Sequence, residues 1–170
     1  VPQNTPFSLQ RYCIPELQSY KGKAVYLDSD MLVLADIRSL LTFDMEGASF
    51  CAAKVRDEWN RSPQLSVLLI DCFKTNWNIK DLVRALLEYG ENVESLIVDG
   101  FAGTDFKRLL PPQWNSLESI EPNTCLVHFT NMRLQPWLDY RNKNTRRWCD
   151  YLLEAIECKK VCYSAVNDSV

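Results

Sequence analysis

The sequence predicts a single α/β domain whose sheet is covered on both faces. Five short apolar runs, several of them apolar at every position, are typical of strands that are buried on both sides. An amphipathic stretch lies between the fourth and fifth runs. With 170 residues, the chain is long enough for one substantial core and too short for two.

The predicted strands, in chain order, are KAVYLD, MLVLA, ASFCAA, SVLLID and TCLVHF, at residues 23–28, 31–35, 48–53, 66–71 and 124–129. The helix predicted between the last two has one apolar stripe, with Asn78 as its cap and Gly90 as its end. The same spacing predicts a second helix around residues 148–156. Residues 56–64 and 121–123 are interpreted as loops.

The composition of the chain argues against some classes of function. The net charge of −3 and a single short basic run, residues 141–147, indicate no nucleic-acid partner. No apolar segment has the length of a transmembrane helix. The seven cysteines are odd in number and form no Cys-x-x-Cys pair, so we expect reduced thiols in a cytoplasmic protein.

Two aspartates follow the first predicted strand directly. Asp28 and Asp30 are two residues apart, and in extended chain such a pair points to the same side. Carboxylates this close repel each other unless a cation or a proton intervenes, and Mg²⁺ or Mn²⁺ prefers such oxygens. The alternative interpretation is a turn with two solvated acids.

Two other functions share this local pattern. A calcium EF-hand loop is excluded, because Leu32, Val33 and Ser39 stand where it needs an oxygen ligand, a glycine and a glutamate. The haloacid-dehalogenase phosphatases resemble the segment locally, with the first aspartate as nucleophile. They also need a downstream lysine and acidic pair, which Asp99 and Asp105 match poorly.

Four segments together resemble the family 8 glycosyltransferases, the retaining group that includes glycogenin: FSLQRYCIPEL, GKAVYLDSDMLVLADIRSL, LPPQWNSLE and CLVHFTNMRLQPW. The resemblance implies the Rossmann-like GT-A fold, a mixed sheet flanked by helices. It implies one catalytic domain over residues 1–162. From the sequence itself, we expect residues 163–170 to form a frayed tail. Since little precedes the first strand, we expect the N-terminal strands of the fold to be missing.

The resemblance also implies a site. Asp28, Asp30 and His128, the only histidine, would hold Mn²⁺ (or Mg²⁺), and the diphosphate of a nucleotide-sugar, most simply a UDP-sugar, would complete the ligand shell. The residues assigned to nucleotide-sugar binding are Arg11, Ser29, Gln64 and Gln135.

Departures from the family pattern limit these assignments. Gln135 stands where the family has a phosphate-binding lysine, and Gln64 replaces the asparagine of an Asn-Ser-Gly element. The family's Asp-Gln-Asp segment has no counterpart, so the catalytic residue stays unknown. The expected function is metal-dependent, retaining sugar transfer to a glycan, lipid or protein acceptor. The alternatives are a non-catalytic binding module and, more distantly, a phosphatase.

Overall fold

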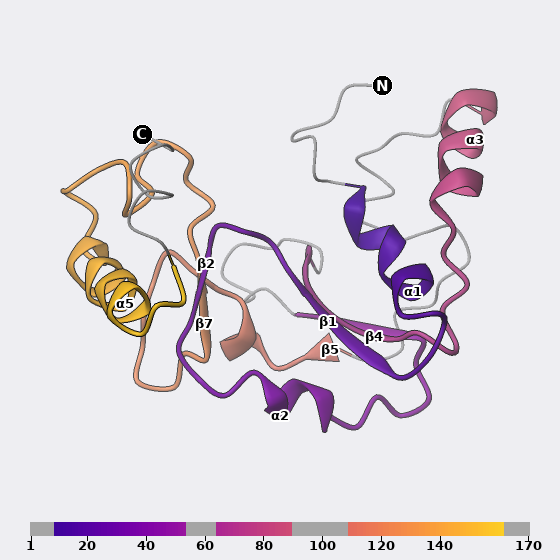
Figure 1. The fold of residues 1–170 in the computed structure, drawn as a ribbon, viewed down its shortest axis with the longest axis horizontal. Coiled ribbons are helices and arrows are strands. Elements are labelled where there is room, and N and C mark those ends of the chain that lie inside the picture. Colours follow the sequence, from indigo (N-terminus) through magenta and orange to yellow (C-terminus); the bar gives the residue numbers. More distant parts are fainter. Residues whose placement is uncertain (1–8, 54–63, 90–108, 162–170) are drawn as a thin grey trace.

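The computed structural model describes residues 9–53, 64–89 and 109–161, which form two mixed sheets flanked by helices (Figure 1). The first sheet has four strands in the order β1 (Lys23–Leu27), β4 (Gln64–Asp71), β3 (Phe50–Ala53) and β5 (Leu109–Leu110). β1 and β3 both run antiparallel to β4, and β5 runs parallel to β3.

The second sheet has three strands in the order β2 (Met31–Val33), β7 (Leu126–His128) and β6 (Ser116–Leu117). β2 is antiparallel and β6 parallel to the central β7. The five predicted strands therefore all exist, although they are divided between two sheets. The two-residue strands β5 and β6 escaped prediction because they are too short to show a period of two.

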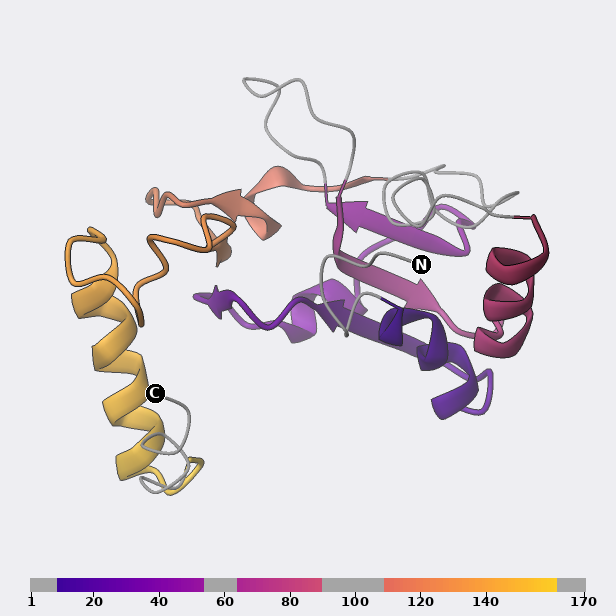
Figure 2. The same ribbon diagram turned by 90° about the horizontal axis from the view of Figure 1, so that it is seen from above.

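The helical elements are η1 (Gln10–Cys13), α1 (Ile14–Leu17), α2 (Arg38–Leu41), α3 (Ile79–Tyr89), η3 (Pro112–Trp114) and α5 (Thr145–Glu157). Both predicted helices are confirmed as α3 and α5, and Asn78 caps α3 by accepting a hydrogen bond from the Lys80 amide at 2.9 Å. Seen from above, α1 and α3 lie at one end of the molecule and α5 at the other (Figure 2). Among the described residues, no helix has the length and apolarity needed to cross a membrane.

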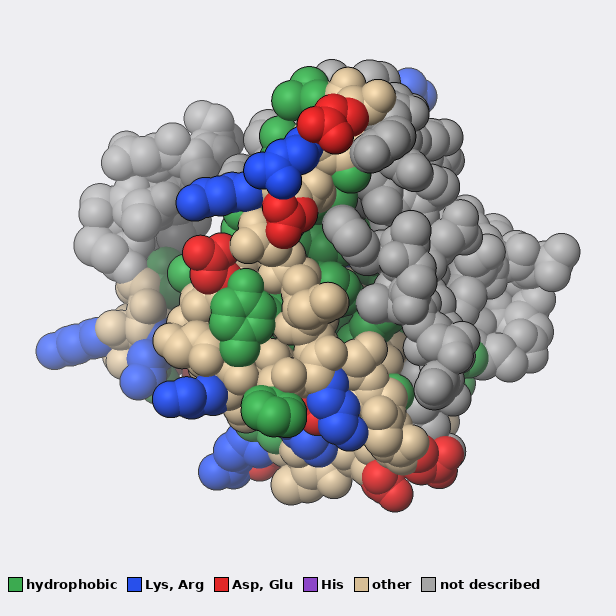
Figure 3. All heavy atoms as spheres, turned by 90° about the vertical axis from the view of Figure 1, so that its right-hand side faces the viewer, with side chains coloured by type: hydrophobic (Ala, Val, Ile, Leu, Met, Phe, Trp, Pro, Cys, Tyr) green, Lys and Arg blue, Asp and Glu red, His purple; other side chains and the backbone are tan. Residues whose placement is uncertain are grey.

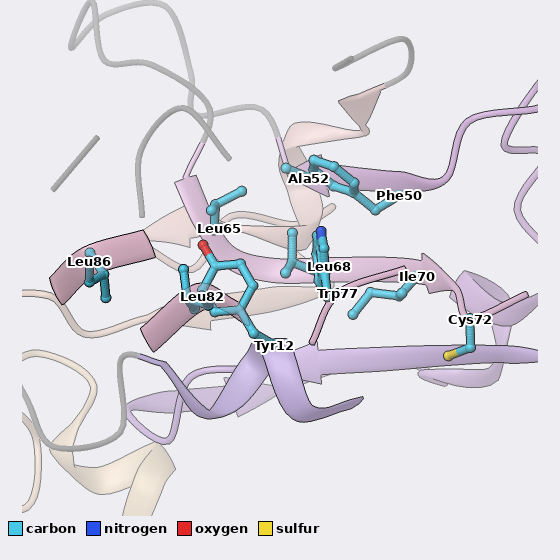
Figure 4. Close-up of a cluster of buried hydrophobic side chains, with 10 residues drawn as sticks. All are labelled: Tyr12, Phe50, Ala52, Leu65, Leu68, Ile70, Cys72, Trp77, Leu82 and Leu86. Carbon is cyan, nitrogen blue, oxygen red and sulfur yellow. The ribbon is translucent and has the colours of Figure 1, made fainter. Parts of the chain in front are cut away.

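The first sheet is buried on both faces, as its uninterrupted apolar strands predict. On β4, Leu68 and Ile70 face a cluster that includes Tyr12, Trp77 and Leu82, from the side of η1 and α3 (Figure 4). The alternate residues of β4 face a second cluster, which α2, η3 and β7 help to close with Leu40, Trp114 and Leu126; those β4 residues are Val67 and Leu69. The two clusters fix β4 as the centre of the fold.

One of the two loop predictions is confirmed, and the other is wrong at Gln64. Residues 121–123 are irregular, as expected. Gln64 was wrongly assigned to a loop: it is the first residue of β4 and pairs with Ala53, across an irregularity in the β3 ladder. The rest of the predicted loop, residues 56–63, and the tail from 163 lie outside the described residues.

The described cysteines are free thiols, and charges of both signs share one face of the molecule. The six described cysteines form no disulfide. Cys51 and Cys72 are fully buried and behave as small apolar residues. On the face of the molecule that carries α1 and α3, acidic and basic side chains are intermingled (Figure 3).

Candidate metal centre

The Asp-x-Asp segment is the crossing point between the two sheets. The Asp28 amide donates to the Ser66 carbonyl at 3.0 Å, which extends the β1–β4 ladder by one bond. Two residues later the Asp30 carbonyl accepts from the Phe129 amide at 2.9 Å, and the β2–β7 ladder begins. Backbone bonds therefore hold this segment at both ends.

His128, the last residue of β7, lies beside this segment because β7 pairs with β2, where Met31 is its partner in register. Its Nε2 lies 3.1 Å from Asp30 Oδ1. One ligand atom each from Asp28, Asp30 and His128 lie within 4.8 Å of one another. The structure therefore brings together the three side chains that the resemblance assigned to a metal.

The surroundings of Asp30 favour its charged form. Burial of the carboxyl opposes ionisation, but the hydrogen bond and the charge of His128 outweigh that effect and lower the pKa of Asp30. About a quarter of the Asp30 side chain remains exposed, whereas that of His128 is 6% exposed. An anionic oxygen at the surface thus faces a buried nitrogen.

Asp28 is held through one of its two oxygens. The Tyr26 hydroxyl donates to Asp28 Oδ1 at 2.6 Å, and Arg11 Nη2 donates to the same atom at 3.3 Å. Arg11 is 5% exposed, also donates to the Leu65 carbonyl, and its guanidinium stacks 4.7 Å from the centre of the Tyr26 ring. Since both donors contact Oδ1, the other carboxylate oxygen is left for a ligand.

Tyr26 is a site residue that sequence reasoning missed. Burial, with the hydrogen bond to Asp28 as a second cause, raises the pKa of Tyr26 well above its ordinary value, so the phenol keeps its proton and stays a donor. The only signal in the sequence was its position two residues before Asp28, where a strand side chain shares a face with the aspartate.

Asn115 is the second residue that was missed, although it belongs to the Trp-Asn element of the resemblance. It directly follows η3 and is 1% exposed. Its Oδ1 lies 3.1 Å from His128 Nδ1, and its Nδ2 donates to Ser66 Oγ at 3.4 Å. The imidazole is therefore contacted at both nitrogens, by Asp30 on one side and by Asn115 on the other.

The residues predicted to bind the nucleotide-sugar lie in different environments from one another. Ser29 is exposed between the two aspartates. Gln135 is buried, and its Nε2 donates to the Phe129 carbonyl at 3.0 Å, next to His128. Gln64 opens β4. The assignment of these residues, and of Arg11, to the donor stays a prediction.

Two further motif residues have structural contacts. The Asp36 carboxylate forms an ion pair with the exposed Arg38 side chain at 2.5 Å and accepts a hydrogen bond from the Arg38 backbone amide. Together these bonds lower the pKa of Asp36 to about 2. Trp137 packs between Phe129 and Trp148, with ring centroids 5.9 Å and 5.8 Å away. Trp137 therefore contributes to the packing of this segment.

The donor set fits a hard divalent cation. Octahedral ligands at about 2.1 Å from one ion lie about 3 to 4 Å from one another, so side-chain rotations of Asp28 and Asp30 would close the observed separations. Two carboxylates and an imidazole suit Mn²⁺ as well as Mg²⁺. Further coordination positions remain for ligand oxygens.

Residues 3–82 match the family described as Glycosyl transferase family 8. This part of the chain is therefore similar to the family 8 glycosyltransferases. The resemblance recognised in the sequence is thereby confirmed for the part that holds the Asp-x-Asp segment. No curated protein matches the chain.

Solved structures share the fold over most of the chain. The glycosyltransferase GlyE of Streptococcus pneumoniae TIGR4 superposes with a TM-score of 0.65 at 21% identity, over 87% of this chain and 43% of GlyE. The galactosyltransferase LgtC, in complex with donor and acceptor sugar analogs, gives 0.64 at 16% identity, over 88% of this chain and 68% of LgtC. The chain therefore has the GT-A fold and spans less than half the length of GlyE.

Proposed function

We propose that this chain is the part of a metal-dependent, retaining glycosyltransferase that binds the diphosphate of a nucleotide-sugar, with a UDP-sugar as donor. The observation that supports it best is the convergence of Asp28, Asp30 and His128 within 4.8 Å, in a chain that matches family 8. A glycan, lipid or protein would be the acceptor, and the cytoplasm is the expected compartment.

In this proposal, three side chains hold the cation. Asp28 and Asp30 supply carboxylate oxygens, and His128 supplies Nε2. A bound Mn²⁺ or Mg²⁺ would act as a Lewis acid on the diphosphate, stabilising the negative charge that develops as the bond to the sugar breaks. The backbone bonds at Asp28 and Asp30 keep this ligand set in place before the donor arrives.

Arg11 serves mainly to orient Asp28. A guanidinium at this position could contact the diphosphate or orient this carboxylate. Its burial and its bonds to Asp28 and to the Leu65 carbonyl support the second role. Ser29, exposed between the metal ligands, is the better placed of the proposed donor contacts.

A thermal-shift experiment tests the proposal. UDP with Mn²⁺, at about a hundred times its dissociation constant, should stabilise the fold by about 2.7 kcal/mol. Asp30→Asn should abolish this response, because it removes an anionic ligand. Asp81→Asn, at an exposed aspartate of α3, should respond like the unmodified chain.

The outcomes separate the alternatives. Stabilisation without release of UDP from UDP-sugars in the presence of acceptors favours the non-catalytic binding module. An aspartyl-phosphate at Asp28 after treatment with phosphate esters favours the phosphatase. A chain that responds to neither Mn²⁺ nor UDP contradicts the proposal.

A further inference from the structure

We propose that residues 131–147, which follow β7 and include the first turn of α5, are a docking surface for a lipid bilayer with anionic headgroups (Figure 1). The inference goes beyond the proposed function, because docking needs neither the cation nor the nucleotide-sugar. It accounts for the single basic run of the sequence, residues 141–147, to which the candidate metal centre gives no role.

The segment has its polar and apolar side chains in inverted positions. Gln135, Asp139 and Asn144 are buried. Of the twelve large apolar side chains that are exposed in the described residues, five lie here instead: Met132, Leu134, Trp137, Leu138 and Tyr140. Such a concentration of exposed apolar side chains is typical of a surface that contacts another phase or molecule.

Hydrogen bonds hold the polar side chains on the inner side. Gln135 Nε2 donates to the Phe129 carbonyl at 3.0 Å, and Asn144 Nδ2 donates to the Glu118 carbonyl at 3.1 Å. The segment is thereby attached to the second sheet at both of its ends. Because polar groups occupy its inner side, the apolar side chains are held outside by the fold itself.

The charge of the segment is opposite to that of the whole molecule. Residues 131–147 contain five basic residues and one acidic residue, a net charge of +4, whereas the chain carries −3. Within the described residues, Arg141 is the one basic residue of this segment that pairs with a carboxylate, that of Asp139. Arg146 and Arg147 lie in the first turn of α5, where the helix dipole disfavours cations. Folding stability therefore does not explain these charges.

An anionic bilayer satisfies both properties of the surface. Aliphatic and aromatic side chains enter the boundary between headgroups and acyl chains, while arginine and lysine stay with the anionic headgroups. A nucleic acid would neutralise the same charges, but it would leave aliphatic side chains such as Met132 and Leu138 in water. The combination of both kinds of side chain favours the bilayer.

Docking would bring the candidate metal centre close to the bilayer. Met132 is four residues after His128, so their Cα atoms lie within about 14 Å of each other. Among the acceptor classes, a lipid-linked one is therefore favoured over a soluble glycan or a protein. This consequence, unlike the docking itself, rests on the proposed function.

Vesicle flotation tests the docking surface without Mn²⁺ or UDP. The chain is mixed with vesicles of equal parts phosphatidylserine and phosphatidylcholine, or of phosphatidylcholine alone, at low ionic strength. We expect it to float with the first vesicles and to stay behind with the second, since each basic side chain near an anionic surface strengthens binding about fivefold. Added salt should weaken the binding, because it screens the headgroup charge.

Matched charge variants locate the contact. Arg146→Gln combined with Arg147→Gln should weaken binding to the phosphatidylserine vesicles about 25-fold. Lys80→Gln combined with Arg84→Gln, at exposed residues of α3, changes the net charge of the chain equally and should leave binding unchanged.

A second pair of variants tests the apolar contribution. Leu138→Gln, at a side chain that is 66% exposed, should weaken vesicle binding about tenfold. Leu17→Gln, at the 78% exposed leucine that ends α1, should have no effect. Circular dichroism checks that every variant keeps the native fold.

Absence of flotation with the phosphatidylserine vesicles, or equal flotation with both kinds, overturns the inference, and neither result needs a variant to fold. Displacement by soluble polyphosphate or duplex DNA, together with unchanged binding of Leu138→Gln, also overturns it, because this would be anion binding without lipid. A chain that floats as expected and binds no Mn²⁺ contradicts the proposed function alone. A chain that binds Mn²⁺ and does not float contradicts the docking surface alone.

Discussion

At the scale of single residues, the candidate site depends on side chains that fix the ligands without binding the cation. Asp28 Oδ1 accepts from both Tyr26 and Arg11, and His128 Nδ1 faces Asn115. Such partners commonly affect metal affinity almost as strongly as the ligands do, because they fix the direction of each lone pair. The role of Tyr26 can be tested by a substitution that removes only its hydroxyl group.

Tyr26→Phe should weaken Mn²⁺ binding about tenfold and lower the free energy of unfolding by about 1 to 2 kcal/mol. The variant keeps the ring under Arg11 and loses the 2.6 Å hydrogen bond to Asp28. Titration with Mn²⁺ and urea denaturation measure the two effects. Tyr140→Phe, at a side chain that is 87% exposed, is the control and should change stability by less than about 0.5 kcal/mol. Equal behaviour of the two variants would contradict the role given to Tyr26.

At the scale of elements, α3 closes the core cluster of Figure 4 with only part of its apolar stripe. Leu82 and Leu86 are buried in that cluster, whereas Leu87 is 76% exposed and Val83 is 41% exposed. Helical spacing alone cannot distinguish these positions, because all four belong to one stripe in the sequence.

Leu82→Ala should destabilise the fold by about 2 to 5 kcal/mol, since it removes buried methyl groups and leaves a cavity. Leu87→Ala is the matched change in the same helix and should cost less than about 0.5 kcal/mol. Urea denaturation followed by circular dichroism compares them. Similar losses from both substitutions would mean that α3 packs with a different face.

At the scale of the whole molecule, two sheets meet at the candidate site. Asp28 is bonded to the first sheet through Ser66, and Asp30 to the second through Phe129. His128 belongs to the second sheet alone. A cation held by all three side chains would link the sheets, so binding should stabilise their junction more than the distant α3.

Hydrogen exchange with mass spectrometry can test this link. With Mn²⁺ at about a hundred times its dissociation constant, peptides covering β2 and β7 should exchange up to about 100-fold more slowly. Peptides covering α3, at the end of the molecule opposite α5, should change little. The Asp30→Asn variant should show no difference with Mn²⁺. Equal slowing in all peptides would indicate a global effect and no specific link between the sheets.

The sequence by itself determined the elements whose signals are local. Uninterrupted apolar runs predicted the strands β1 to β4 and β7. One apolar stripe, with Asn78 ahead of it, predicted α3. Asp28 and Asp30 were found because two charges directly after an apolar strand need a cation or a solvated turn. His128 was included only through the resemblance to a family.

Only the tertiary structure decided how the strands divide into two sheets and which side chains serve the ligands. Asn115 meets Ser66 across 49 residues of sequence and His128 across 13. Gln64 belongs to a strand because it pairs with Ala53, although the polar residues before it in the sequence predicted a loop. Contacts of this kind arise from hydrogen bonding and packing between distant segments, and no periodicity within one segment records them.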